Sequence, residues 1–297
     1  MTLRTTPLTP HFGVSVDGIA LSEVTTTHLY PDIRALFEEH SALLFRGQEL
    51  TDAQHMHLAQ LFGPIEDRKA DERKPGETFE IPKVSNVRDD GSTTAEMDHH
   101  TLHLKANFLW HCDSTFMPAP ALTNLLVARV VTETGGHTEL ASTRVGWAEM
   151  PEALKARVRG RGVWHAYRHS RGKISPELAE QAMFNKWPDQ HWKANWTNPV
   201  NGREALYLAS HSFKVDGYDQ AQSQQLIDEL IGFCTRPAFV YSHKWQVGDV
   251  LIWDQRAVLH RGTPWTYEKA RTLSSICVSA TASDGLDALR PISVVEQ

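Results

Sequence analysis

The sequence FVYSHKWQVGDVLIWDQRAVLHRGTPWTYEKARTLSSICVSAT, residues 239–281, contains four short runs rich in β-branched and aromatic residues. The runs FVYSHKW, DVLIWD, AVLHRG and RTLSSICVSAT are separated by turn residues, and this pattern predicts four β-strands. An earlier block, TNLLVARVV and HTELAS around the turn ETGG (residues 123–142), has the same character. Two blocks of short strands far apart in the chain are typical of a double-sheet jelly roll. We therefore expect a mainly β fold with flanking helices, built as a double-stranded β-helix.

Several other segments have the apolar spacing of helices. In TDAQHMHLAQLFG (residues 51–63), Thr51 and Gln54 form a capping-box pattern, and Gly63 stands where a C-cap glycine is expected. Further helices are predicted at residues 31–40, at 147–158, after Ser175-Pro176, and at 219–234 with Asp219 as the N-cap.

The chain contains no internal repeat, low-complexity tract or linker that would divide it, so we expect one domain over residues 1–297. Residues 64–108 and 168–198 interrupt the regular pattern with charged or irregular sequence. Long irregular segments inside a compact domain are usually functional lids or disordered. We favour lid-like insertions, with plain disorder as the alternative.

The composition excludes several classes of function. The formal net charge is −6 and there is no basic stripe with interleaved aromatic residues, which argues against a nucleic-acid partner. No apolar run has the length of a membrane span or the form of a signal peptide. The three cysteines are odd in number and far apart, as expected for free thiols in a reducing compartment. We expect a soluble cytoplasmic protein with no membrane partner.

The run LWHCDSTF (residues 109–116) places His111 and Asp113 two positions apart. On a strand, such residues point to the same face, and both could reach one metal ion. With 16 histidines in the chain, about one His-x-Asp is expected by chance, so the pair alone decides nothing. His260, near the end of AVLHRG, is the candidate third ligand on a distant strand. Two histidines and one carboxylate form the facial triad of non-haem Fe(II) oxygenases.

Other histidines have simpler interpretations. His137 and Glu139 in GGHTEL form a second His-x-carboxylate pair, but their place directly after a glycine turn favours the polar start of a strand. His165, His169 and His191 lie in polar, loop-like contexts and are predicted to be solvated.

Arg271 follows His260 by eleven residues and begins the last predicted strand. A guanidinium offers a carboxylate two parallel hydrogen bonds, which suits an organic acid whose other end chelates iron. The alternative is an exposed arginine at a strand entrance, and Arg271 by itself does not exclude that.

Taken together, WHCDSTF, GGHTEL, GDVLIWDQRAVLHRG and the arginine that follows them resemble the taurine dioxygenase family of Fe(II)/2-oxoglutarate-dependent dioxygenases. Within this family the chain looks most similar to the aryloxyalkanoate (2,4-dichlorophenoxyacetate) branch. The resemblance implies that His111, Asp113 and His260 ligate iron, and that Thr138 and Arg271 hold the distal carboxylate of 2-oxoglutarate. The implied cofactors are Fe(II), 2-oxoglutarate as co-substrate, and O2.

The resemblance also implies a reaction. We expect hydroxylation of a small organic acid with release of succinate and CO2, in particular of an aryloxyalkanoate ether that then collapses to a phenol and an oxo acid. The alternatives are the same chemistry on a sulfonate, a sulfate ester or another small natural acid, and a metal-binding jelly roll without oxygenase activity. The presence of Thr138 and Arg271 argues against the last, because hydrolysis needs neither.

The chain departs from the family at a position where several relatives bind the substrate. Several relatives carry a second arginine four residues after the first, and here that position is Ser275. Asn107 matches a substrate-contacting position of the family, and His211 resembles a pocket-edge histidine of the aryloxyalkanoate branch. Arg68 and Lys69, where the first insertion begins, are the candidate partners for the substrate anion, although a solvated surface would explain both. We expect a small acidic substrate and a homo-oligomer.

Overall fold

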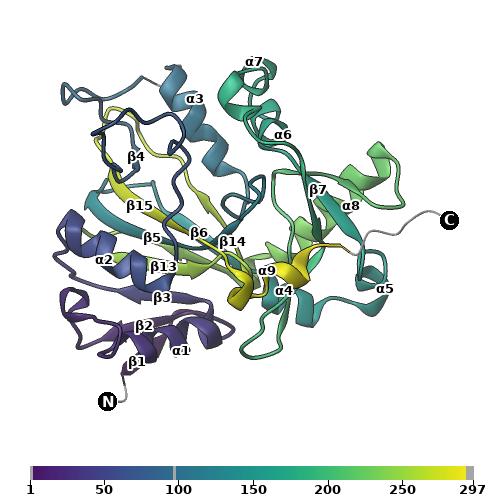
Figure 1. Cartoon of the computed structure of the whole chain (residues 1–297), viewed down its shortest axis with the longest axis horizontal. Helices are drawn as coiled ribbons and strands as arrows, with labels where there is room; N and C mark the ends of the chain where they lie inside the picture. The colour runs from purple at the N-terminus through teal and green to yellow at the C-terminus, as the bar shows by residue number, and fades with distance from the viewer. Residues whose placement is uncertain (1–2, 96–97, 292–297) are drawn as a thin grey trace.

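Two β-sheets that face each other dominate the architecture (Figure 1). The computed structural model describes residues 3–95 and 98–291. Within them the larger sheet has the strand order β1-β2-β3-β13-β5-β15-β4. Its strands span Arg4–Pro7 (β1), Val14–Asp17 (β2), Ala42–Phe45 (β3), Val250–Asp254 (β13), Ala121–Val130 (β5), Thr272–Ser279 (β15) and Lys83–Ser85 (β4).

The smaller facing sheet has the order β12-β6-β14, with strands Val240–His243 (β12), Thr138–Ser142 (β6) and Val258–Gly262 (β14). His111 extends this sheet through an antiparallel bridge to His260. The two residues exchange backbone hydrogen bonds of 3.0 and 2.8 Å. The bridge therefore places two residues from distant parts of the sequence side by side.

The alternation of side chains along β5 explains why this strand is apolar on both faces. Leu126 and Ala128 point between the two sheets, where they pack with Leu140 of β6. Leu125 and Val127 point to the opposite face. Helices α1 (Tyr30–His40) and α2 (Asp52–Phe62) cover that face (Figure 1).

A second group of elements packs beside the paired sheets and forms its own apolar cluster with α8. Its strands are Gly162–His165 (β7), Gln190–Lys193 (β8), Ser212–Val215 (β11), Asn195–Thr197 (β9) and Glu204–Leu206 (β10). The remaining helices are His99–Lys105 (α3), Thr143–Glu149 (α4), Glu152–Lys155 (α5), Tyr167–Gly172 (α6), Pro176–Ala179 (α7), Gln220–Cys234 (α8) and Leu286–Leu289 (α9). Short 3-10 turns occupy Leu21–Glu23, Ala106–Phe108, Ala182–Phe184, Pro237–Phe239 and Ala282–Asp284.

The two predicted insertions meet at one end of the molecule, the upper end in Figure 1, where α3 and α6–α7 lie. In the first, β4 pairs with β15 and so joins the edge of the larger sheet. Lys186 of the second insertion donates hydrogen bonds to the carbonyl of Arg68 at 2.8 Å, to Asp71 at 2.6 Å and to Glu72 at 2.7 Å. The segments are thus tied to each other as well as to the sheets. Whether the chain behaves as one domain with lids stays a prediction.

Several predicted elements are confirmed. Helix α1 covers the predicted range 31–40, and α2 and α8 begin with the capping boxes expected from Thr51 and Asp219. The four closing strands are also present. No helix in the described part of the chain is long and apolar enough to cross a membrane.

Four expectations are wrong. The helix predicted at 147–158 is two short helices, α4 and α5, because Met150 before Pro151 adopts an extended conformation. His165 is fully buried inside β7, and His191 stacks on Trp164 and pairs with Asp216 at 2.8 Å, so neither is a solvated loop residue. His169 is half-buried, and its ring packs against Phe213. A polar sequence context does not reveal which strand face a histidine occupies.

Candidate metal centre

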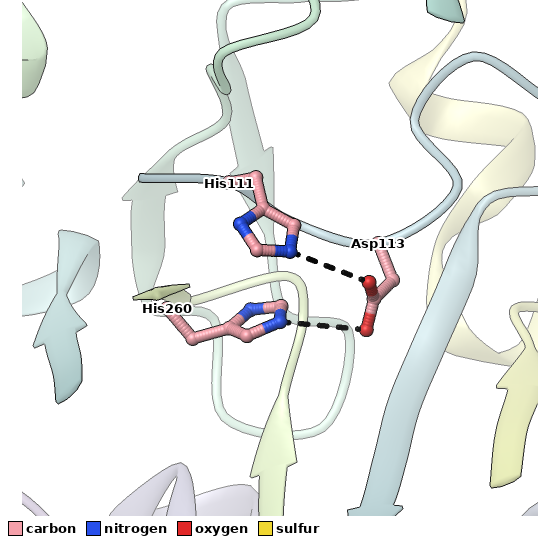
Figure 2. A group of neighbouring side chains, drawn as sticks. All are labelled: His111, Asp113 and His260. Atoms are coloured by element: carbon pink, nitrogen blue, oxygen red, sulfur yellow. Dashed lines mark ion pairs between the residues drawn. The ribbon is translucent and has the colours of Figure 1, made fainter. Parts of the chain in front are cut away.

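His111, Asp113 and His260 meet at the end of the smaller sheet. The His111 Nε2 atom lies 3.8 Å from Asp113 Oδ1, and the His260 Nε2 atom lies 3.7 Å from Asp113 Oδ2. Figure 2 shows both imidazoles turned toward the carboxylate, one toward each oxygen. The two rings are 4.0 Å apart. The structure therefore brings together the three residues that the spacing and the resemblance predicted.

The histidine rings present the right nitrogen to this centre. His111 Nδ1 lies 2.7 Å from the carbonyl oxygen of Leu109. A carbonyl only accepts, so Nδ1 carries the proton and the Nε2 lone pair is free for a metal. Burial lowers the pKa of His111, and burial together with His111 lowers the pKa of His260 to about 3. Both rings are consequently neutral at physiological pH, as a metal ligand requires.

Asp113 is fixed by two side-chain amides. Asn124 Nδ2 donates to its Oδ2 at 2.9 Å, and Gln255 Nε2 donates to the same oxygen at 2.6 Å. Gln255 Oε1 also accepts from the backbone N–H of Asp113 at 3.0 Å. Burial opposes ionisation, but the neighbouring histidines and Arg68 lower the pKa of Asp113 to about 2. The residue is therefore an oriented carboxylate anion.

These three side chains fit a metal better than they fit each other. Separations of 3.7 and 3.8 Å are too long for hydrogen bonds, and the ligand atoms all lie within 4.8 Å of one another. Oδ1 of Asp113 receives no hydrogen bond from the described residues, so it remains available for an ion. Two neutral imidazoles and one carboxylate are the donor set of a non-haem Fe(II) facial triad.

Trp253, Asp254 and Gln255 each stabilise the surroundings of this centre. The Trp253 ring packs 4.7 Å from that of His260. Asp254 is fully buried and pairs with Arg256 at 2.8 Å, which anchors the end of β13. Gln255 orients Asp113. The sequence analysis did not predict this role of Gln255, which holds Asp113 through its side-chain amide.

Ser275 stands where several relatives carry an arginine, and it hydrogen-bonds to a residue that holds Asp113. Its hydroxyl donates to Asn124 Oδ1 at 3.0 Å, and Asn124 in turn holds Asp113. Ser275 and Asn124 project from neighbouring strands of the larger sheet into the space between the sheets. The residue therefore contributes to the arrangement of the metal triad.

Arg271 and Thr138 lie on the same side of the centre. Thr138 of β6 is paired in register with Gly262, two residues from His260 along β14, or roughly 7 Å by strand geometry. Arg271 Nε donates to the carbonyl of Gly136 at 3.0 Å, and its guanidinium lies 4.8 Å from the Trp265 ring. A Cβ on Gly136 would come within 2.9 Å of Arg271 Nε, so the Gly-Gly turn is what lets the arginine approach.

Arg271 is a buried cation without an internal counter-ion. Only 4% of the residue is exposed, and no carboxylate among the described residues pairs with it. Burial lowers its pKa to about 10, which still leaves it charged at neutral pH. The alternative of an exposed surface arginine is thus wrong. A buried, unpaired guanidinium creates a site that an anion would stabilise.

Arg68 and Lys69 have different surroundings. Arg68 donates to Glu66 at 2.5 Å and to the hydroxyl of Ser114 at 2.9 Å. Ser114 follows Asp113 in a left-handed conformation with φ 59°, which is costly for a residue other than glycine. Arg68 therefore helps to hold the backbone beside the triad. Lys69 is exposed on the turn of the first insertion.

An aromatic wall lies next to the triad. The Phe116 and Tyr167 rings are stacked 3.8 Å apart and almost parallel, at 3°. His211 is buried, 4.8 Å from Phe116 and 6.3 Å from His111. Burial, Arg171 and His111 hold the pKa of His211 well below its usual value, so it is neutral. Asn107 is half-buried in the 3-10 turn before Leu109, close to Gly262 at the end of β14.

The second His-x-carboxylate pair, His137 and Glu139, interacts with residues outside the metal centre. His137 Nδ1 lies 3.3 Å from the Ser242 hydroxyl, and Glu139 pairs with Arg261 at 2.7 Å. They belong to the start of β6, as expected from the glycine turn. Arg171 on α6, next to Tyr167, was not predicted as a site residue. No motif marks it, and only the folded position of α6 brings it near the triad.

Two facing sheets with a His-x-Asp and distant His triad define the class of non-haem iron oxygenases. Residues 4–277 match the model of the taurine catabolism dioxygenase TauD, TfdA family. The chain belongs to this family. Its expected fold and its class, a 2-oxoglutarate-dependent non-haem iron dioxygenase that uses Fe(II), 2-oxoglutarate and O2, are thereby confirmed.

Individual relatives are similar over most of their length. The chain is 33% identical over 276 residues to an alpha-ketoglutarate-dependent 2,4-dichlorophenoxyacetate dioxygenase of Cupriavidus pinatubonensis, covering 92% of this chain and 96% of that protein. It is 32% identical over 275 residues to an (S)-phenoxypropionate/alpha-ketoglutarate-dioxygenase of Sphingobium herbicidovorans, covering 90% and 91%. The crystal structure of AAD-2 in complex with Mn(II) and N-oxalylglycine superposes with a TM-score of 0.88 at 30% identity, covering 95% of this chain and 99% of that one.

Proposed function

We propose that this protein hydroxylates a small aryloxyalkanoic acid at the carbon that bears the ether oxygen. One O2 and one 2-oxoglutarate would be consumed, and succinate, CO2 and a hemiacetal would form. The hemiacetal would break its C–O bond to give a phenol and an oxo acid. The observation that carries the proposal is the placement of the triad against an aromatic wall of Phe116, Tyr167 and His211. The relatives named for 2,4-dichlorophenoxyacetate and phenoxypropionate support this substrate class.

Iron held by His111, Asp113 and His260 would supply the activation of O2 that couples oxidation of 2-oxoglutarate to hydroxylation of the substrate. The protein keeps the ligand geometry constant through Gln255 and Asn124. Such supporting hydrogen bonds orient a ligand and tune the affinity for metal.

Arg271 and Thr138 would hold the distal carboxylate of 2-oxoglutarate. Arg271 is buried, charged and without a counter-ion among the described residues. Its Nε is committed to Gly136, which fixes the plane of the guanidinium and leaves the other nitrogens for a bidentate contact. The Thr138 hydroxyl accepts from Trp245 at 3.0 Å, so its own proton is free to be donated to a carboxylate.

The aromatic wall would position the substrate ring and exclude water. Offset or edge contacts with Phe116 and Tyr167 favour a flat aryl group. His211 is neutral and its Nδ1 has no partner in the described structure, so it can meet a polar substituent without adding charge. Asn107 is proposed to contact the substrate from the opposite side, at the end of β14.

A second candidate is oxidation of a sulfate ester at the carbon next to the sulfate. An alpha-ketoglutarate-dependent sulfate ester dioxygenase of Pseudomonas putida is 25% identical over 290 residues, and this relation favours the alternative over other acids. Both candidates need the same triad and an anion-binding group.

The proposal is tested by supplying Fe(II) and 2-oxoglutarate to the protein anaerobically, admitting air, and following succinate with a substrate panel. We expect phenoxyacetate and phenoxypropionate enantiomers to stimulate succinate and to release phenol. Stimulation by alkyl sulfates alone would select the second candidate. Succinate formation that none of the acids or esters stimulates would overturn both.

Two broader expectations remain proposals. The cysteines described as free are consistent with a reducing cytoplasm. A homo-oligomer is expected, and light scattering on the purified protein would give its mass.

A further inference from the structure

Two guanidinium groups lie against the aromatic wall, and only one of them is neutralised. Arg68 lies 5.4 Å from the Phe116 ring and pairs with Glu66. Arg171 lies 4.5 Å from the Tyr167 ring and has no carboxylate partner among the described residues. Its hydrogen bonds go to two neutral hydroxyls, Ser170 at 3.0 Å and Tyr167 at 3.2 Å. Arg171 Nε is buried and has no partner in the described structure.

The position of Arg171 connects it to the reaction centre. Tyr167, on which it rests, is stacked on Phe116, and both rings contact His211. Burial is the main cause of the lowered pKa of His211, and the charge of Arg171 is the next. The same charge contributes to the lowered pKa of His111. The guanidinium therefore contributes to the electrostatic environment of both histidines, and it packs against the Tyr167 ring of the wall.

Among the described residues, the hydrogen bonds of Arg171 go to hydroxyl groups and not to a counter-ion. Burial and Arg68 lower the pKa of Arg171, whereas Tyr167 raises it, and the net result is a lowered pKa. The carboxylate of Asp113 acts to raise the pKa of Arg171, and a bound metal would offset that charge. A half-buried cation whose Nε is unsatisfied costs free energy until an anion arrives. A negative group of a substrate that reached Arg171 would offset this cost.

We propose that Arg171 receives the carboxylate of the substrate, and that Arg68 acts on the substrate only indirectly, by positioning Ser114 and Asp113. This inference rests on the proposed function and names the residue that gives it its preference for acids. It replaces the second arginine that is absent at Ser275. If Arg171 on α6 binds the carboxylate with two hydrogen bonds, a cation at the Ser275 position of β15 is not needed.

The test compares an acid with its uncharged isostere. Phenoxyacetate and phenoxyacetamide have the same shape, so an effect of charge appears only in the ratio of their KM values. Arg171→Gln should raise the KM of the acid by roughly 10- to 100-fold, the range expected for losing a hydrogen bond to a charged group. The KM of the amide should change less than about threefold, and Arg171→Lys should fall in between, because a lysine keeps the charge but not the fork.

A matched control is available on the same helix. Arg168 pairs with Asp189 at 2.6 and 2.8 Å and lines a separate surface cavity with His169 and Lys173. Arg168→Gln should leave both KM values unchanged. Calorimetry of phenoxyacetate with protein loaded with Mn(II) and N-oxalylglycine gives the same comparison without turnover.

The outcomes separate this inference from the proposed function. An unchanged acid KM in Arg171→Gln, or equal changes for acid and amide, would overturn the inference while the aryloxy activity stands. If the wild-type protein oxidises only sulfate esters, the aryloxy assignment fails, and the same variants decide the inference with an alkyl sulfate and its parent alcohol. If the wild-type protein binds none of these anions, the inference fails as well.

Discussion

The two sides of the candidate site are built differently. The side with the metal triad comes from sheet strands and the residues next to them, and its key carboxylate is held by Asn124 and Gln255. The opposite side comes from α6 and from the start of the first insertion, and it carries Arg171, whose Nε is unsatisfied. Two amide donors fix the orientation of Asp113, whereas the Arg171 Nε donor has no partner among the described residues. The difference indicates that the strands supply the common chemistry and the insertions supply the choice of substrate.

Removing a triad ligand should have the largest effect. His111→Ala, Asp113→Ala and His260→Ala should each abolish substrate-dependent succinate formation, because the described chain offers one carboxylate and two imidazoles at this point. Iron binding by the purified variants and succinate release are the measurements. His137→Ala is the control and should retain iron, since His137 bonds to Ser242 outside the centre. Full activity in any triad variant would show that the metal lies elsewhere.

The next effect concerns the buried arginine on the strand side. Arg271→Lys should raise the half-saturation concentration of 2-oxoglutarate sharply, by an order of magnitude or more, since an ammonium cannot reproduce the planar fork. The KM of the acid substrate should change little. Equal shifts in both constants would mean that Arg271 does not distinguish the two sides of the site.

A smaller effect is expected from the amide that orients Asp113. Gln255→Met removes both of its hydrogen bonds and keeps the side-chain length. Apparent iron affinity should fall about 10- to 100-fold, as is usual for residues that support a ligand. Titration of the apoprotein with Fe(II) measures this. Gln225→Met, at an exposed position of α8, is the control.

The strand side could be predicted from sequence and the insertion side could not. Short motifs with fixed spacing identified His111, Asp113 and His260. The strand expected to carry the first two is wrong, because His111 forms a single β-bridge and Asp113 lies in a turn. The same reasoning found α2 and α8 from their caps. Gln255 and Ser275 carried no such signal, since their function depends on which residue the opposite strand places within reach. Arg171 depends on how α6 packs against Phe116, a contact between residues far apart in the chain.

The smallest effects should come from the two cations that the sequence offered as substrate anchors. If both residues bound the substrate anion, neutralising them together would weaken acid binding and spare 2-oxoglutarate. The structure gives the two residues different surroundings. Lys69 is exposed, so Lys69→Gln should change the KM of the acid within about twofold, or about 0.4 kcal/mol.

Arg68 pairs with Glu66 and holds Ser114, so Arg68→Gln should weaken acid binding severalfold through the geometry of Asp113. Because the substrate carboxylate is expected on Arg171, the amide of the acid should be affected by Arg68→Gln to the same extent as the acid. The double Gln variant should then match Arg68→Gln alone, since a solvated lysine adds no coupling. Steady-state kinetics on the three variants decides it. The double variant could instead bind the acid much more weakly than Arg68→Gln does, with no such difference for the amide. That result would show that Lys69 contributes to binding the substrate carboxylate, and that the carboxylate lies near the first insertion.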